Sequence, residues 1–220
     1  MNRSMFLRAS LRAASALALA GAAGFPLQAL AANPAEGKDF LTVKPPQPVD
    51  GQGKIVVTEF FWYGCPHCFE LEPSIVAWGK KQSKDVSFQL VPVSFNDTTL
   101  PHSQIYYALE TLGKLEELHD KVFNAIHVQR KRLLKEDEIA DWMASQGVDH
   151  AKFLAAFKSF SANSKSRGAN KMADDYRLDG VPAIAVNGKY LTSPSIAGSS
   201  ERVLQTLDFL IAQERGAKKK

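Results

Sequence analysis

A strand-like run that leads directly into a pair of cysteines constrains this chain more than any other feature. Residues 54–62 have the sequence KIVVTEFFW, a nearly unbroken series of apolar, β-branched and aromatic side chains. Such a run is typical of a central strand that is covered on both faces. Cys65-Pro66-His67-Cys68 follows after two residues, and proline is well tolerated at the first position of a helix. The sequence therefore predicts that the cysteines lie where a buried strand passes into a helix.

The remainder of the chain alternates between strand and helix patterns. A short edge strand is predicted around 40–43 and a second buried strand over 86–93. Asn187-Gly188 lies between two short apolar runs, which is the strongest short-range signal for a β-hairpin. Helical spacing of apolar residues predicts the other elements, over 105–126, 136–146, 149–157, 164–178 and 199–213. The predicted order is βαβ, then a group of helices, then ββα.

Residues 1–31 form a segment that is typical of a cleaved secretion signal. Arg3, Arg8 and Arg12 precede an apolar run, and Ala29-Leu30-Ala31 fits the small-x-small cleavage pattern, so we expect cleavage after Ala31. The alternative is a membrane anchor. Glycine and proline interrupt the run, however, and its strongly apolar part is shorter than the roughly 20 residues that a span needs. We therefore expect an exported protein.

The basic charge of the chain lies at its two ends. The sequence carries 27 Lys and Arg against 23 Asp and Glu, but three of the arginines belong to residues 1–31. Without them 24 basic residues face 23 acidic ones, and Lys218, Lys219 and Lys220 are among the 24. We expect this basic tail, residues 215–220, to be frayed and solvated. A nearly neutral body argues against binding to nucleic acid.

The two cysteines are more readily explained by reactivity than by a structural role. Export places the protein in an oxidising compartment, where disulfides form. A disulfide stabilises a fold mainly by closing a long loop, and a two-residue loop gains little in this way. Cys-x-x-Cys is also found as half of a zinc site or as a metal-chaperone site. Zinc would need two further ligands, and there is no second cysteine pair.

The other histidines do not complete a metal site. They show no ligand spacing, and we expect most of them to lie on the surface: His102, His119, His127 and His150. No metal ligand and no cofactor is therefore predicted.

The chemistry of the motif follows from its place at a helix start. Pro66 lacks an amide proton, and the free amides of His67 and Cys68 would point toward the sulfur of Cys65. The positive end of the helix favours a thiolate there, and a protonated His67 would stabilise it further. A stabilised thiolate favours the dithiol form, so the disulfide becomes an oxidant. Cys68, one turn into the helix, should be more buried and less reactive than Cys65.

Glu59 is an unexpected charge within the predicted strand. A carboxylate in an apolar run needs a compensating reason. One interpretation is a buried proton acceptor beneath the cysteine pair, and the other is a charge at the strand end that reaches solvent. We predict the proton acceptor, on the strength of the resemblance described next.

These motifs resemble those of the DsbA family of periplasmic thiol:disulfide interchange proteins. The resemblance rests on Glu59-Phe60-Phe61, on the Cys-Pro-His-Cys motif followed by Glu72, and on Gly180-Val181-Pro182-Ala183 before the hairpin. It covers nearly the whole chain after residue 31. It implies a thioredoxin fold with a helical domain between its two halves. It also implies a cis Val181–Pro182 bond that faces the cysteines and binds substrate.

We accordingly divide the chain into a signal peptide (1–31), a first half of the thioredoxin fold (32–98), a helical insertion (99–163), a second half (164–214) and the tail. The resemblance implies a monomeric periplasmic enzyme that donates the Cys65–Cys68 disulfide to reduced, unfolded exported proteins through a mixed disulfide on Cys65. It further implies reoxidation by a quinone-linked membrane oxidase of the DsbB type.

Two other functions fit parts of the sequence. One is a disulfide isomerase or reductase, but isomerases of this fold usually carry a separate dimerisation domain, and residues 32–53 are too few for one. The other is a metal-binding module that uses Cys65, Cys68 and His67 as ligands. Metal content and thiol titration distinguish this last function from redox chemistry.

Overall fold

One five-stranded mixed sheet organises the part of the chain that the structure, a computed structural model, describes. That part is residues 32–217, so the predicted signal peptide (1–31) and the lysines of the predicted tail (218–220) lie outside it. The strand order is β1-β5-β4-β2-β3. The strands are β1 (Leu41–Thr42), β2 (Ile55–Phe61), β3 (Val86–Pro92), β4 (Ala183–Val186) and β5 (Tyr190–Thr192).

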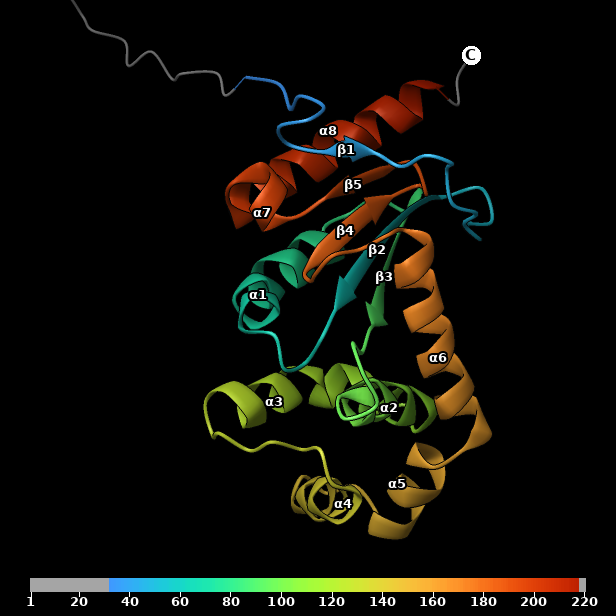
Figure 1. Cartoon of the computed structure of the whole chain (residues 1–220), viewed down its shortest axis with the longest axis vertical. Helices are drawn as coiled ribbons and strands as arrows, with labels where there is room; N and C mark the ends of the chain where they lie inside the picture. The colour runs from blue at the N-terminus through green and yellow to red at the C-terminus, as the bar shows by residue number, and fades with distance from the viewer. Residues whose placement is uncertain (1–31, 218–220) are drawn as a thin grey trace, which may run out of the picture. The chain divides into compact units, whose positions relative to one another are not determined.

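Helices flank the sheet and form a separate group beyond one end of it (Figure 1). Between β3 and β4 the chain forms α2 to α6. The helices are α1 (Pro66–Lys80), α2 (Leu100–Thr111), α3 (Leu115–His127), α4 (Glu136–Ser145), α5 (His150–Phe157), α6 (Phe160–Asp175), α7 (Pro194–Ala197) and α8 (Ser200–Ala217). This order confirms the predicted fold class, a thioredoxin fold with helices between its halves.

Strand β2 is the centre of the sheet and is buried along its whole length. It runs parallel to β3 and antiparallel to β4. Because successive strand residues point to opposite faces, Ile55 and Val57 pack in a core with α1 and α8, whereas Phe60 packs in a second core with Tyr176, the residue that follows α6. Burial on both faces explains why its sequence is apolar without alternation.

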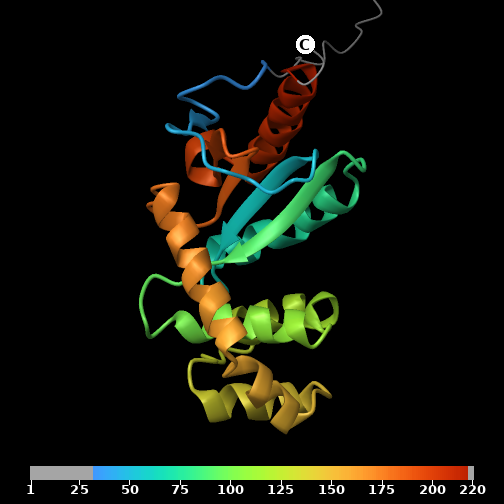
Figure 2. The same ribbon diagram turned by 90° about the vertical axis from the view of Figure 1, so that its right-hand side faces the viewer.

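The group of helices below the sheet has its own core, which reaches the cysteines. Apolar side chains of α2 to α5 fill it, and Phe61, Tyr63, Cys65 and Cys68 belong to the same cluster. Figure 2 shows α6 running from this group up along the sheet. The strand-to-helix junction therefore lies where the two cores meet.

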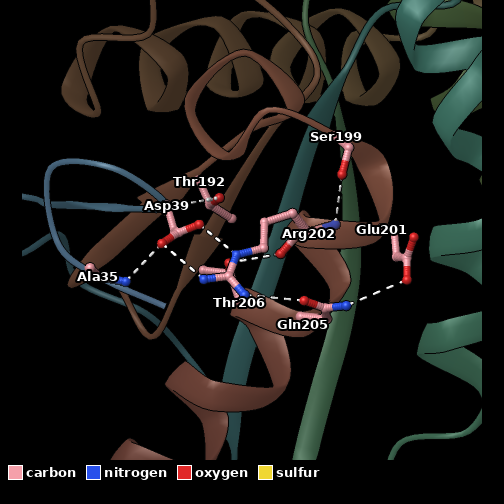
Figure 3. Close-up of polar contacts among 8 residues, drawn as sticks. All are labelled: Ala35, Asp39, Thr192, Ser199, Glu201, Arg202, Gln205 and Thr206. Atoms are coloured by element: carbon pink, nitrogen blue, oxygen red, sulfur yellow. Dashed lines mark hydrogen bonds and ion pairs between the residues drawn. The ribbon is translucent and has the colours of Figure 1, made fainter. Parts of the chain in front are cut away.

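The segment before β2 is held to the last helix by a buried ion pair (Figure 3). Nε and Nη2 of Arg202 donate to the two carboxyl oxygens of Asp39 at 2.6 and 3.1 Å. The hydroxyl of Thr192 donates to the backbone carbonyl of Asp39 at 2.7 Å. Since Thr192 belongs to β5, these contacts tie the predicted edge strand, β1, both to the sheet and to α8.

Local signals in the sequence account for most element ends. Asn187 and Gly188 have φ of 52° and 71°, the left-handed pair that a two-residue hairpin needs. Asp149 caps α5 by accepting from the amide of Lys152 at 2.8 Å. The stretch predicted over 105–126 is divided at Gly113, whose φ is 65°. The short helix α7 was not predicted, and α8 continues through Ala217, into the first residues of the predicted tail.

Candidate active site

The first turn of α1 positions the two cysteines. Cys65 is the N-cap residue, with extended backbone angles of φ −86° and ψ 119°, and Pro66 opens the helix. The amide of Cys65 donates to the carbonyl of Trp62 at 2.9 Å, and the Cys65 carbonyl accepts from the amide of Phe69 at 3.1 Å. Both cysteines are free thiols in this structure. The predicted strand-to-helix junction is therefore present.

The environment of Cys65 favours its thiolate. The pKa of Cys65 is lowered to about 6, chiefly by a hydrogen bond from the Cys68 side chain. The backbone amides of Cys68 and His67 and the charge of His67 lower it further, against the opposing effect of burial. Cys65 retains 8% of its surface exposed. A thiolate that is reactive and slightly exposed can exchange with the sulfur of a second molecule.

Cys68 has the opposite environment. It is completely buried, and burial raises its pKa far above that of a free thiol, with the nearby Cys65 and Glu59 adding to the effect. The two sulfurs therefore differ in both exposure and acidity. Cys65 is the sulfur that a second molecule can reach, and Cys68 keeps its proton at neutral pH.

His67 points outward from the helix start. Its side chain is 71% exposed, and its Nδ1 lies 3.1 Å from a carboxyl oxygen of Glu70. The Glu70 contact raises the pKa of His67. More of the imidazole is consequently charged near neutral pH, and that charge is one of the influences that lower the pKa of Cys65.

The loop before β4 brings a backbone carbonyl to the reactive sulfur. The Val181–Pro182 bond is cis, and the Cys65 thiol donates to the carbonyl oxygen of Val181 at 3.3 Å. A cleft of about 340 Å³ opens beside this contact, between the loop, His67 and the start of α7. We call it the Val181 cleft. Val181 and Pro182 lie far from the motif along the chain. Only the family resemblance therefore predicted that they face the cysteines.

Glu59 is completely buried, and neither of its carboxyl oxygens has a hydrogen-bond partner among the described residues. Burial raises its pKa well above the usual value, and the neighbouring Glu72 raises it further. The charge of Glu59 in turn raises the pKa of Cys68. The carboxyl group therefore interacts electrostatically with the buried thiol, and the alternative of a strand-end charge reaching solvent is wrong.

A buried polar chain that the sequence did not predict lies beside Glu59. The Tyr63 hydroxyl lies 2.6 Å from Nδ1 of His119, and Nε2 of His119 lies 2.9 Å from Oε1 of Glu72. Burial raises the pKa of Tyr63, so its hydroxyl stays protonated. Three elements contribute: the turn after β2, α1 and α3. The sequence singled out Glu72 only as one of the residues that carry the family resemblance.

The expectation that most of these histidines lie on the surface is wrong. His102 and His119 are buried, and His127 is partly buried. His102 lies 2.9 Å from the Arg132 carbonyl through Nε2, and His127 lies 2.8 Å from the Tyr63 carbonyl. The His127 ring also stacks on Phe69, with 4.9 Å between ring centroids. In each case a backbone carbonyl or a buried partner satisfies a ring nitrogen, which offsets the cost of burial.

Within residues 32–217, no three His, Cys, Asp or Glu side chains are grouped so that they could hold a metal ion. His67, which the metal-binding interpretation requires as a ligand, engages Glu70 through Nδ1. The geometry of the motif is that of a dithiol pair.

The sequence has known relatives along almost its entire length. Residues 75–204 match the family model of the DSBA-like thioredoxin domain. The chain is 48% identical over 203 residues to the thiol:disulfide interchange protein DsbA of Burkholderia cepacia. The aligned region covers 92% of this chain and 95% of that protein. It is 42% identical over 202 residues to the protein of the same name from Pseudomonas aeruginosa, covering 92% of this chain and 96% of that one.

Solved structures show the same likeness. The crystal structure of Pseudomonas aeruginosa DsbA superposes with a TM-score of 0.80 at 42% identity, over 84% of this chain and 96% of that one. The oxidoreductase DsbA from Xylella fastidiosa superposes with a TM-score of 0.77 at 33% identity, over 83% of this chain and 98% of that one.

Proposed function

This chain belongs to the family of DsbA-like thioredoxin-domain proteins and is a thiol–disulfide oxidoreductase, and from that premise we propose that Cys65 is its nucleophile and Cys68 its resolving cysteine. The observation that carries the proposal is the contrast between the two sulfurs. Cys65 is partly accessible with a pKa of about 6, whereas Cys68 is completely buried with a raised pKa. Reactivity of a thiol follows its thiolate fraction and its access.

The disulfide is transferred to the client in two exchange steps. A client thiolate attacks the Cys65 sulfur of the Cys65–Cys68 disulfide, so that a client–Cys65 bond forms and Cys68 leaves as a thiolate. The second client thiolate then attacks the client sulfur of this mixed disulfide, and Cys65 leaves. The client loses two electrons and becomes a disulfide, while the enzyme becomes a dithiol. A leaving thiol of low pKa departs faster, which suits Cys65 to this position.

Glu59 supplies the proton that Cys68 needs. A thiolate at a fully buried site is unfavourable, so Cys68 must be protonated when it leaves and deprotonated when the pair is reoxidised. The raised pKa of Glu59 favours its protonated form, and its charge acts on the pKa of the buried Cys68 thiol. Glu59 donates the proton in the first direction and accepts it in the second, which is general acid–base catalysis.

The Val181 cleft binds the client backbone. The carbonyl of Val181 lies beside the reactive sulfur, and a backbone edge recognises an extended chain without regard to its side chains. An oxidase of unfolded proteins needs that tolerance. Trp62 and Phe69, both partly buried, add apolar contact, whereas Tyr63 belongs to the core.

The remaining proposals concern the place and the partners of the enzyme. Removal of residues 1–31 delivers a monomer to the periplasm, where its clients are reduced exported proteins and a quinone-linked membrane oxidase of the DsbB type regenerates the disulfide. Among the described residues, none of the helices combines the length and apolar character that a membrane span requires. Residues 99–163 are proposed as an insertion between the halves 32–98 and 164–214.

A stoichiometric oxidation assay tests the proposed function. Oxidised protein is mixed with a reduced, unfolded two-cysteine client, and both partners are followed by thiol alkylation and mass spectrometry. We expect the client to gain a disulfide as the enzyme gains two thiols, and Cys65→Ser to abolish the exchange. Equilibration with glutathione buffers should show a more oxidising pair than a structural disulfide. An enzyme that stays oxidised in the presence of the reduced client would contradict the proposal.

A further inference from the structure

A second cleft, of about 490 Å³, adjoins the cysteine motif. Its walls come from three segments, 62–64, 96–102 and 126–134, and we call it the Trp62 cleft. It reaches the motif at Gly64, whereas the Val181 cleft reaches it at His67. The two clefts therefore meet the chain on either side of Cys65. Of the residues that line this second cleft, the mechanism above uses only Trp62.

Cationic side chains without partners border the Trp62 cleft. Arg130, Lys131 and Arg132 are all exposed, and within the described part of the chain none of their side chains has an ion pair or a hydrogen bond. No acidic residue of that part lines the cleft. Asp97 lines a neighbouring cleft instead, and Lys131 also borders a hollow that contains Glu138 and Asp141. Arg130 and Arg132 are thus the cations that remain for a ligand.

The lining of the Trp62 cleft is basic although the chain as a whole is nearly neutral. Once residues 1–31 are set aside, the chain has 24 basic and 23 acidic residues. Other exposed cations of the described residues also lack an ion-pair partner, but Arg130, Lys131 and Arg132 are gathered in one cleft that also contains Gly64, the residue before Cys65. The Trp62 cleft is therefore complementary to negative charge.

One wall of the cleft is formed by two stacked rings. His102 is 3% exposed, and its Nε2 lies 2.9 Å from the Arg132 carbonyl. The partly buried ring of Trp62 stacks on His102 and offers apolar surface to the cleft. The exposed Phe95 ring meets Trp62 edge-on at 6.2 Å.

Gly64 keeps this wall close to the reactive sulfur. A Cβ atom at Gly64 would overlap the indole ring of Trp62, so the ring lies directly against the backbone next to Cys65. An extended chain spans about 3.3 Å per residue. A client whose cysteine is bonded to Cys65 can therefore place on Trp62 a segment that lies only a few residues from that cysteine.

We propose that the Trp62 cleft binds an acidic segment of the client that flanks its reacting cysteine. This inference rests on the proposed function, because it assigns a substrate preference to the same enzyme. Arg130 and Arg132 attract the acidic side chains, Trp62 and Phe95 cover the apolar part of the segment, and the Val181 cleft holds the chain on the other side of Cys65. The enzyme remains tolerant of sequence but favours cysteines with acidic neighbours.

Matched two-cysteine peptides test this preference. The peptides differ only in carrying Glu-Glu or Ser-Ser beside one cysteine, on its N-terminal or C-terminal side, and their oxidation by stoichiometric enzyme is followed by liquid chromatography. Three proteins are compared: the parent, Arg130→Gln/Arg132→Gln, and the control Lys152→Gln/Arg167→Gln. The control removes the same charge from exposed cations on α5 and α6 that have no ion-pair partner in the described residues.

The measured quantity is the rate ratio of the Glu peptide to the Ser peptide in each protein. Comparing ratios cancels the effect of the acidic residues on the peptide's own thiol pKa. We expect the ratio to fall about fivefold in Arg130→Gln/Arg132→Gln and to be unchanged in the control, and the parent's ratio to fall as salt is raised toward 0.5 M. Equal ratios in all three proteins, or an equal fall in the control, would overturn the inference. A parent that oxidises neither peptide would contradict the proposed function instead.

Discussion

The thiol of Cys65 donates to the carbonyl oxygen of Val181 across 3.3 Å, although the two residues are 116 positions apart. This contact joins the start of α1 to the loop before β4, and so it brings together the two halves of the thioredoxin fold at the reacting atom. A client sulfur that bonds to Cys65 necessarily comes close to the backbone of Val181. Disulfide exchange at Cys65 and recognition of the client backbone at Val181 therefore take place at the same point of the structure.

The lowered pKa of Cys65 predicts that the reduced protein gains stability with pH. The folded pKa is about 6 against an ordinary value of 9.0, so the contribution is fully present above 9, and it is lost as pH falls through 6. At pH 7 it is on the order of 1 kcal/mol. Urea denaturation of both redox forms between pH 4 and 9 measures it. A difference between the forms that does not change with pH would contradict this assignment.

Replacing Glu59 by glutamine should slow the steps in which Cys68 gains or loses its proton. Glutamine keeps the shape but cannot transfer a proton, so we expect disulfide transfer to slow roughly ten- to hundredfold at pH 7. Stopped-flow fluorescence of client oxidation measures the rate, and Glu116→Gln, at an exposed position on α3, is the matched control.

Stability gives an independent measure of the same side chain. Because burial raises the pKa of Glu59, the unfolded chain releases this proton at a lower pH than the folded protein does, so the native state loses stability as pH rises above the ordinary value of 4.5. Glu59→Gln should therefore stabilise the protein more at pH 8 than at pH 4. Unchanged rates together with an unchanged pH profile of unfolding would remove Glu59 from the mechanism.

Glu72 and His119 should be strongly coupled. Their side chains are only 4% and 8% exposed, and Nε2 of His119 lies 2.9 Å from Oε1 of Glu72. Removing one member leaves the other buried without its partner, so Glu72→Leu or His119→Leu should each cost about 3–5 kcal/mol. The double variant should cost clearly less than the sum. Urea denaturation of the four proteins gives the coupling, and the exposed pair Lys158–Glu136 is the control that should show none of this size. Strictly additive losses would show that the pair is not coupled.

Asp39→Asn should loosen the segment before β2. Arg202 lowers the pKa of Asp39, so the stabilisation is present above the ordinary value of 3.8 and is lost as pH falls through the lower folded value. We expect a lower Tm at pH 7 and faster proteolysis within 33–53, with the difference from the parent shrinking toward pH 3. Asp50→Asn, at an exposed position, should leave the Tm unchanged. A parent and an Asp39→Asn variant with the same Tm at pH 7 would show that the ion pair contributes nothing.

Signals that act between near neighbours were sufficient to predict much of the fold. The run into β2, Pro66 at the start of α1 and the Asn187-Gly188 turn each depend on a few adjacent residues, and each forms as expected. The place of Glu59 in an apolar strand left two interpretations open, and the family resemblance favoured the buried carboxyl group that the structure has. The position of the cysteines at a helix start was likewise visible from the spacing alone.

The interactions across the chain were not visible in this way. The Tyr63–His119 hydrogen bond joins residues 56 positions apart. The spacing of Leu115, Val122 and Phe123 places His119 on the apolar face of α3, but no signal near it identifies its distant partner. The Arg130 and Arg132 side chains border the motif only because the turn after α3 returns toward Trp62. Such contacts depend on how helices pack, which periodicity does not determine.

Trapping of mixed disulfides tests the central claim most directly. Cys68→Ala, Cys65→Ala and the parent are each expressed with residues 1–31 included, quenched with acid, and analysed for disulfide-linked clients by non-reducing electrophoresis and mass spectrometry. If Cys65 is the nucleophile and Cys68 resolves the intermediate, Cys68→Ala should accumulate clients bonded to Cys65, while Cys65→Ala should hold none. Clients bonded to Cys68 in Cys65→Ala, with none in Cys68→Ala, would contradict the assignment of the two sulfurs.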